Sequence, residues 1–316
     1  MNPLAPAGLV DRWALFAAVL VVVGAAAFRF LVLRRASVRQ ATAVSGRGDA
    51  LEIHTARLAT MGACLGLLAS VSRLPLQFSE LYDNASPIFP QLTALGLHTE
   101  WGLVWGCQVL LMFSAALAYT AAARGRRGWL LAALIAVPLA ATLSLSGHAL
   151  GSERLTVLAV ASDIVHVVGA SAWLGSMILL LRSLMLVHKG FSRESDPPAS
   201  VSPGILAAAI VVAYSPLALT SASLVLLSGI VASWLHLGSL AALWQSRYGL
   251  TLVVKLVAVG VMTATGAVNW RKLGPALVKS GETAPIHRSI RLEVILGVMV
   301  LLVTAVLVVT PEPGSE

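Results

Sequence analysis

The chain has 316 residues, of which 58% are apolar and only 11% are charged, whereas soluble domains carry about 25% charged residues. Its net charge of +8 comes mainly from basic residues in short connections between apolar runs, a placement typical of membrane topology rather than of nucleic-acid binding. The composition therefore excludes an ordinary water-soluble domain. We expect the protein to lie in a lipid bilayer and not to bind nucleic acid.

Eight apolar runs are long enough to cross a hydrocarbon core of roughly 30 Å. The first run ends at Arg34 and Arg35; because its positive flank follows it, we expect a retained helix rather than a signal peptide. The segment from Arg73 to Glu100 contains three prolines, so we expect irregular backbone or short interfacial pieces there. We predict an all-α integral membrane protein, with a single polytopic domain over residues 1–316 and no soluble domain. The predicted spans are residues 12–33, 53–74, 101–122, 128–147, 156–184, 205–234, 248–269 and 290–310.

The basic residues divide unequally between the two faces that eight spans create. Connections after spans one, three, five and seven hold 15 Lys and Arg residues, and the opposite face holds 4. Since Lys and Arg gather on the cytoplasmic side, both termini are predicted to face the periplasm or the exterior.

A weak internal repeat relates the two halves of the chain. Residues Glu100–Leu103 open the third span and Arg247–Leu250 open the seventh, and both contain an aromatic residue followed by glycine. Six residues after each glycine stands a polar residue, Gln108 in one half and Lys255 in the other. Because spans three and seven run in the same direction, the pattern predicts two parallel four-helix repeats.

Four histidines fall on the outer side of this topology, namely His98, His148, His166 and His236. Imidazole binds copper, zinc, iron and nickel, so four such groups at one end of a bundle indicate a metal site. The alternative is four separate interfacial histidines, because spacing along the sequence does not give distances between helices.

His166 is the strongest single candidate, because it lies inside a span. At about 100° per residue, Asp163, His166, Trp173 and Met177 share one helix face. Asp163 could accept the second N–H of the imidazole, and Met177 offers a thioether that suits Cu(I). A packing stripe with a hydrogen-bonded histidine explains the same pattern, and both interpretations stay open.

Several short motifs together resemble one known family, the copper resistance protein D (CopD) family. The motif residues lie between about residues 155 and 272, in the family's order. They are His166–Gly175, Ser228–Ile230, Tyr248–Leu250, Lys255–Leu256 and Asn269–Arg271.

The resemblance implies an inner-membrane protein that takes up copper or manages its delivery, often with a periplasmic copper-binding protein of the CopC type. No such domain is fused here, so this partner would be a separate protein. His166 and Trp173 carry over from the family pattern, and Tyr248, Lys255 and Asn269 carry over as motif residues of unknown role.

Three functions are compatible with these observations. The favoured hypothesis is a copper permease that is not an enzyme, in which copper binds His166 with help from His98, His148 or His236 and passes inward toward Met177. The second is a redox protein with haem b held between histidines. The third is a copper sensor or assembly factor that does not transport.

Overall fold

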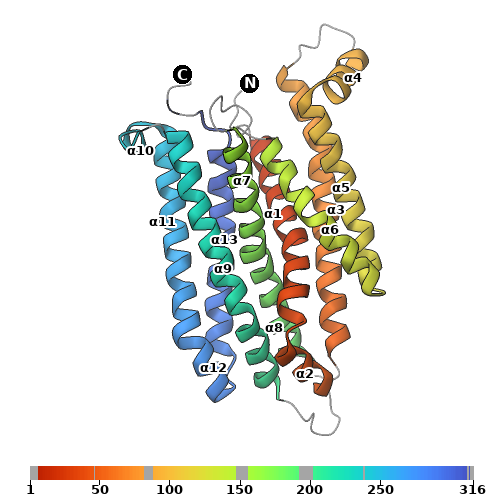
Figure 1. Ribbon diagram of the computed structural model, residues 1–316, viewed down its shortest axis with the longest axis vertical. Helices are drawn as coiled ribbons and strands as arrows, with labels where there is room; N and C mark the ends of the chain where they lie inside the picture. Colours follow the sequence, from red (N-terminus) through yellow and green to blue (C-terminus); the bar gives the residue numbers. More distant parts are fainter. Residues whose placement is uncertain are drawn as a thin grey trace.

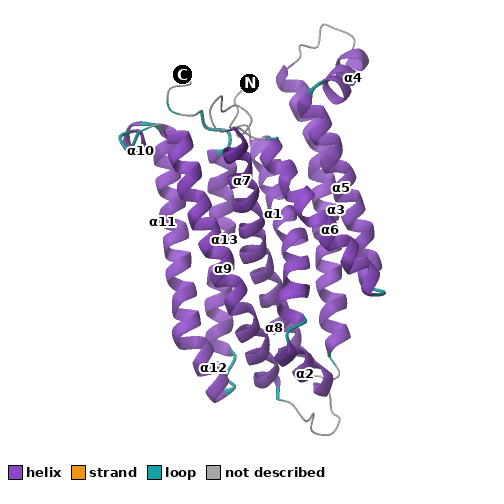
Figure 2. Ribbon diagram, viewed as in Figure 1, coloured by secondary structure: helices purple, strands orange, loops and turns teal. Residues whose placement is uncertain are grey.

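Long helices, packed side by side, make up the molecule (Figure 1). All the regular elements that the described residues form in the computed structural model are helical (Figure 2). The structure describes residues 6–45, 47–81, 88–146, 156–191, 202–237, 239–311 and 313.

Eight of the helical segments are long and apolar enough to cross a membrane, which confirms the predicted number. Three spans contain a π-helical turn, written η, in which one extra residue widens the helix. The elements are α1 (Pro6–Phe28), η1 (Arg29–Leu33), α2 (Ala36–Ser45), α3 (Gly48–Leu81), α4 (Ile88–His98), α5 (Glu100–Ala122), α6 (Arg126–Leu145), α7 (Thr156–Ala170), η3 (Ser171–Gly175), α8 (Ser176–Phe191), α9 (Pro203–Leu237), α10 (Ala242–Gln245), α11 (Arg247–Val268), η4 (Asn269–Leu273), α12 (Gly274–Ser280) and α13 (Ala284–Leu307).

The second span differs from its prediction at its far end. Helix α3 continues through Pro75 to Leu81, where an irregular segment was expected from Arg73 onward. Proline removes one backbone hydrogen bond and bends a helix, but it does not always end one. The expected short piece before the third span is present as α4.

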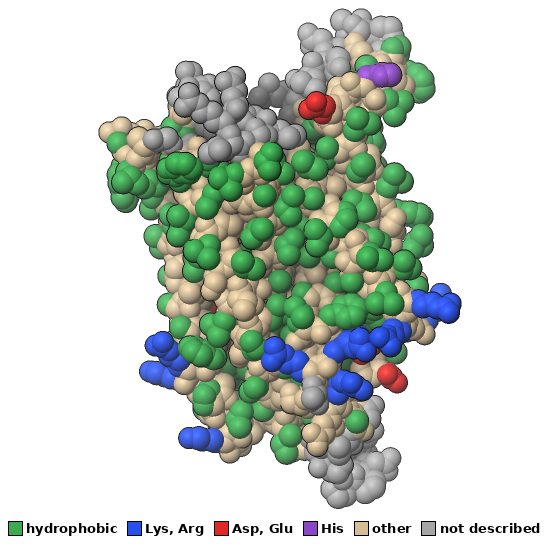
Figure 3. Space-filling model, viewed as in Figure 1, with side chains coloured by type: hydrophobic (Ala, Val, Ile, Leu, Met, Phe, Trp, Pro, Cys, Tyr) green, Lys and Arg blue, Asp and Glu red, His purple; other side chains and the backbone are tan. Residues whose placement is uncertain are grey.

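The two ends of the bundle differ in charge. Helix α1 begins and α13 ends at the end drawn uppermost in Figure 1, where α4 and α10 also lie; we call this the upper end. On the face drawn in Figure 3, Lys and Arg side chains gather toward the opposite end, which we call the basic end. This arrangement agrees with the predicted division of basic residues. The assignment of the upper end to the periplasm stays a prediction.

Helix α1 joins the two halves of the chain, since it packs against α3 and α6 on one side and against η3, α8 and α13 on the other. Its crossing with η3 depends on two glycines. A Cβ on Gly175 would stand 1.9 Å from the carbonyl oxygen of Leu20, and one on Gly24 would stand 2.6 Å from that of Ser171. The Ser176 hydroxyl also donates to the Gly24 carbonyl at 3.0 Å. Small residues thus let the two backbones touch, as is common between membrane helices.

Helices α5 and α11 begin in the same way. The Thr99 hydroxyl accepts the Gly102 N–H at 2.9 Å, and the Ser246 hydroxyl accepts the Gly249 N–H at 2.9 Å. In both cases a Cβ on the glycine would stand 2.2 Å from a carbonyl oxygen of the preceding short helix, α4 or α10. The two corresponding motifs therefore adopt matching capped structures, and the four-helix repeat stays a prediction.

Candidate functional site

His166 lies about three turns below the start of α7, and its ring meets α9. Its Nδ1 atom is 3.0 Å from the hydroxyl oxygen of Ser228. That hydroxyl donates its own hydrogen to the carbonyl of Leu224 at 2.6 Å, so its oxygen accepts from the Nδ1–H of His166. A neutral imidazole with its proton on Nδ1 has its lone pair on Nε2, the atom that binds a metal.

A lysine from another helix interacts electrostatically with this histidine. Lys255 of α11 interacts electrostatically with His166 and with Asp163 of α7. A lysine inside a span needs a carboxylate or a water-filled path, and Asp163 supplies the opposite charge. We call Asp163, His166, Ser228 and Lys255 the His166 cluster; it joins α7, α9 and α11.

The helix below His166 is not regular. Residues Ser171–Gly175 form the π-helical turn η3, and one extra residue rotates everything after it by about 100° around the axis. The single stripe predicted from Asp163 to Met177 is therefore interrupted at η3. Met177 is buried in the core, and Trp173, also buried, accepts a hydrogen bond on its carbonyl from the Tyr214 hydroxyl at 2.9 Å.

The other outer histidines take different positions. His98 ends α4 and is exposed, and Figure 1 shows α4 well apart from α7 at the upper end. His148 lies outside the described residues. His236 is in the last turn of α9, and its side chain lies outside the described part. Among the described residues, no three His, Cys, Asp or Glu side chains come together as a metal site, so convergence of these histidines stays a prediction.

A second group of polar side chains lies nearer the basic end. Its main member, Glu293, was not predicted from the sequence. The Asn269 side-chain amide donates to Oε1 of Glu293 on α13. Glu293 also interacts electrostatically with Tyr214. The sequence signal for Glu293 was a carboxylate inside the final apolar run, which marks a candidate functional group in a membrane span. Ser228 and Tyr214 carried no comparable signal, because a hydroxyl in a helix usually bonds to its own backbone.

Tyr248, the remaining motif residue, packs among apolar side chains. It is buried in the first turn of α11 and packs with Leu252 and Leu307 in a small apolar cluster at the upper end. Tyr248 lies near the start of α11, and Lys255 follows about two turns further on the same side of that helix.

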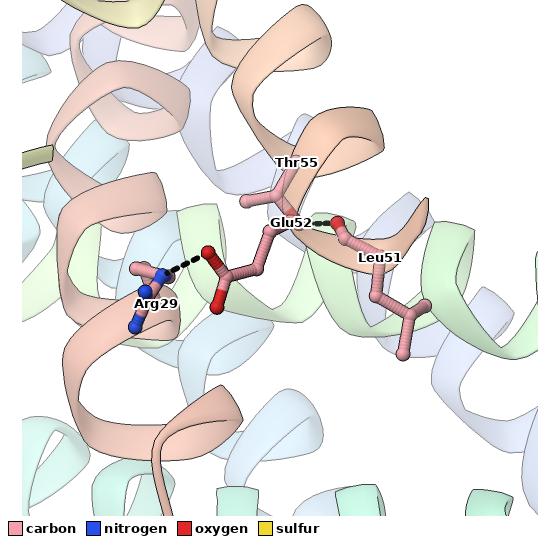
Figure 4. Close-up of polar contacts among 4 residues, drawn as sticks. All are labelled: Arg29, Leu51, Glu52 and Thr55. Carbon is pink, nitrogen blue, oxygen red and sulfur yellow. Dashed lines mark hydrogen bonds and ion pairs between the residues drawn. The ribbon is translucent and has the colours of Figure 1, made fainter. Parts of the chain in front are cut away.

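A partly buried ion pair links two helices near the basic end (Figure 4). The Nε atom of Arg29 in η1 lies 2.8 Å from Oε2 of Glu52 on α3. The guanidinium also lies 5.6 Å from the ring centroid of Trp129 on α6. One turn further along α3, the Thr55 hydroxyl bonds to the carbonyl of Leu51 at 2.7 Å. This group joins three helices of the first half of the chain and is separate from the His166 cluster.

Two family descriptions match this chain and together cover most of it. Residues 4–156 match "Copper resistance protein D-like, N-terminal domain", and residues 208–307 match "Copper resistance protein D". The second match contains Ser228, Lys255, Asn269 and Glu293. The chain belongs to the copper resistance protein D family.

Two proteins named for copper transport or copper resistance are similar over nearly the whole chain. "Copper transport protein CutJ" of Bacillus subtilis is 26% identical over 323 residues, which cover 99% of this chain and 54% of CutJ. "Copper resistance protein D" of Pseudomonas syringae pv. tomato is 27% identical over 299 residues, which cover 90% of this chain and 89% of that protein. The chain thus spans about half the length of CutJ. No solved structure matches.

Membership of the CopD family, with eight apolar helices, supports a multi-pass membrane protein with a role in handling copper. The matched range 208–307 contains the motif residues Lys255 and Asn269, whereas His166 lies between the two matched ranges.

Proposed function

We propose that this protein is a copper permease of the bacterial inner membrane that accepts copper ions from the periplasm at the upper end. The observation that carries the proposal is the contact between His166 and Ser228. This contact directs the Nδ1 proton toward Ser228 and leaves the lone pair of Nε2 for a metal ion. The CopD family assignment supports copper as the ion.

His148 and His236 are the further ligands that we propose. The chain reaches His148 directly after α6, and His236 belongs to α9; both helices pack against α7. His98 belongs to α4, which packs on α3 and α5. We propose that His98 binds copper at the surface of the upper end, before the ion reaches His166. Asp163, one turn above His166 on α7, adds negative charge near the ion.

Below His166, copper moves toward the thioether of Met177. Two buried methionines lie deeper in this half of the bundle, Met177 after η3 and Met262 on α11. Thioethers suit Cu(I). A separate periplasmic protein of the CopC type is the proposed donor, and both chain termini are proposed to lie on that side.

Metal analysis and optical spectroscopy test the proposal directly. Purified wild type, His166→Ala and His287→Ala are loaded with copper and freed of excess metal. His287 lies near the start of α13 at the basic end, so it serves as a control for loss of a histidine. We expect stoichiometric copper in wild type and His287→Ala, and loss of at least one copper ion in His166→Ala.

Two outcomes would overturn the proposal. Equal copper in all three proteins would exclude His166 as a principal ligand. A haem Soret band in the wild type would favour the redox alternative, in which histidines bind haem b. Copper uptake into vesicles that contain the protein then separates a permease from a sensor, because only a permease moves the ion across the membrane.

A further inference from the structure

Glu293 and Asn269 form a buried polar pair near the basic end of the second half of the bundle. Glu293 is 5% exposed and lies on α13, nine residues after that helix begins at the basic end. Its Oε1 atom accepts a hydrogen bond from the amide nitrogen of Asn269, the first residue of η4. The same oxygen would lie 3.8 Å from a Cβ on Gly266, one turn earlier in the span. The carboxyl group therefore faces α11 and not the lipid.

An ionised carboxylate in this place loses most of its hydration. Removing a charge from water costs several kcal/mol unless a cation or several hydrogen bonds compensate for it. Within the described residues, the polar partners of Glu293 are one amide donor and the electrostatic contact with Tyr214, which is neutral. Neither partner supplies positive charge, so the site favours the uncharged, protonated acid over the carboxylate.

Asn269 has an unused acceptor. Its Oδ1 atom is buried and has no hydrogen-bond partner among the described residues. Buried polar atoms are nearly always paired, and an exception calls for an explanation. A primary amide rotates by half a turn about its terminal bond with little change of shape. Asn269 can therefore donate through Nδ2 to a carboxylate, or accept through Oδ1 from the O–H of a carboxylic acid.

We propose that Glu293 and Asn269 form a proton-binding site inside the membrane, which takes up and releases one proton. In the ionised state the amide nitrogen donates to the carboxylate. On protonation one carboxylate oxygen gains the proton, and its new O–H donates to Oδ1 of the rotated amide. The pair thus provides a hydrogen bond in each state, and the orphaned acceptor is used when the proton is bound.

Among the described residues, no charged group on the surrounding elements forms an ion pair with Glu293. Helix α13 packs against α11, η4, α1 and α8. On η4, Arg271 and Lys272 are exposed. On α8, Arg182 is exposed and interacts with His54. Further charged or titratable residues on or next to these elements are Arg29 next to α1, paired with Glu52; Asp11 and Arg12 in the upper half of α1; Arg247 and Lys255 in the upper half of α11; His188 and Lys189 in the last turn of α8; and His287 with the exposed Arg288 and Arg291 on α13 itself.

The pair is connected to the helix that carries His166. Tyr214 interacts with Glu293 and donates its hydroxyl hydrogen to the carbonyl of Trp173, within the π-helical turn η3. That turn lies two turns below His166 on the same helix. A change in the charge of Glu293 therefore acts on the turn below the proposed copper site. If the proposed function holds, proton release at Glu293 accompanies copper movement past η3.

Infrared spectroscopy without copper tests the proton site alone. A protonated carboxyl group has a C=O stretching band that a carboxylate lacks, and hydrogen–deuterium exchange shifts this band. Wild type, Glu293→Gln and Asp11→Asn are titrated across neutral pH. Asp11 is a matched control, because it is another buried carboxyl in a span, held by the Ser72 hydroxyl at the upper end.

We expect a band that disappears with rising pH in wild type and in Asp11→Asn, and that is lost in Glu293→Gln. In Asn269→Leu, which keeps the carboxyl and removes its partner, the band should shift in frequency; this variant also serves if Glu293→Gln does not fold. The proposal is overturned if Glu293→Gln keeps the pH-dependent band, or if no band in wild type changes with pH.

A second step separates this proposal from the copper function. Copper is added to wild type and to His166→Ala at fixed pH. A change in the Glu293 band that requires His166 supports coupling between the two sites. An unchanged band in a wild type that binds copper overturns the coupling, while failure of the wild type to bind copper overturns the proposed function and leaves the proton titration as an independent result.

Discussion

The imidazole of His166 and the hydroxyl of Ser228 meet at 3.0 Å across the contact of α7 and α9. They are separated by 62 residues in the chain, and each comes from a different motif. The contact sets which ring nitrogen carries the proton, and so it decides which nitrogen is offered to a metal ion.

The first prediction concerns that contact. Ser228→Ala removes the oxygen that accepts from Nδ1–H, so the ring is held less firmly in the metal-binding tautomer. Replacing such a supporting group typically costs about 10- to 100-fold in metal affinity, and we expect about 10-fold weaker copper binding, measured by competition with a chelator. Ser223→Ala is the matched control, because Ser223 lies on the exposed side of α9 and bonds only to its own helix, at the Leu219 carbonyl. Equal affinity in the two variants would contradict the assignment.

The second prediction is that removing the charge of Lys255 strengthens copper binding. Its positive charge acts on both His166 and Asp163, and it opposes a second cation at the same place. Lys255→Met should therefore strengthen copper binding, by about 1 kcal/mol or fivefold for charges several ångströms apart. Arg247→Met, which removes an exposed charge from the start of the same helix, should leave the affinity unchanged. Weaker binding in Lys255→Met would show that the lysine supports the site instead.

The crossing of α1 and η3 predicts a large effect on stability. Gly175→Ala would place a Cβ 1.9 Å from the Leu20 carbonyl oxygen, so the helices must separate. We expect a loss of about 1–3 kcal/mol in unfolding free energy, seen as a lower thermal midpoint in detergent. In Gly106→Ala the new Cβ meets nothing within 4 Å, and the midpoint should stay or rise, since alanine favours helix. A similar fall in both variants would point to a general intolerance of helix glycines rather than to this crossing.

The matching starts of α5 and α11 predict matching energetic costs. Thr99→Ala and Ser246→Ala each remove the hydroxyl that accepts the N–H two residues into the helix. Loss of such a cap costs about 1 kcal/mol, so both variants should show similar decreases in thermal stability. Thr93→Ala on α4, whose hydroxyl bonds to its own helix at the Pro90 carbonyl, provides the comparison. A cost at only one of the two caps would weaken the argument for corresponding halves.

The sequence alone was sufficient for the membrane architecture. Long apolar runs must become helices in lipid, since every backbone polar group has to be paired within the segment. The eight spans were therefore predictable from hydropathy, and the gathering of basic residues toward one end followed from their positions in the chain. The motifs from His166 to Asn269 were also enough to indicate the family.

Only the tertiary structure decided which side chains meet. Spacing along one helix predicts a shared face, but the extra residue in η3 interrupts the stripe between His166 and Met177, and a π-helical turn has no clear sequence signal. The contacts of His166 with Ser228 and of Asn269 with Glu293 join different helices. They depend on how those helices rotate and pack, which is set by close approaches such as that of Gly24 and Gly175 and not by distance along the chain.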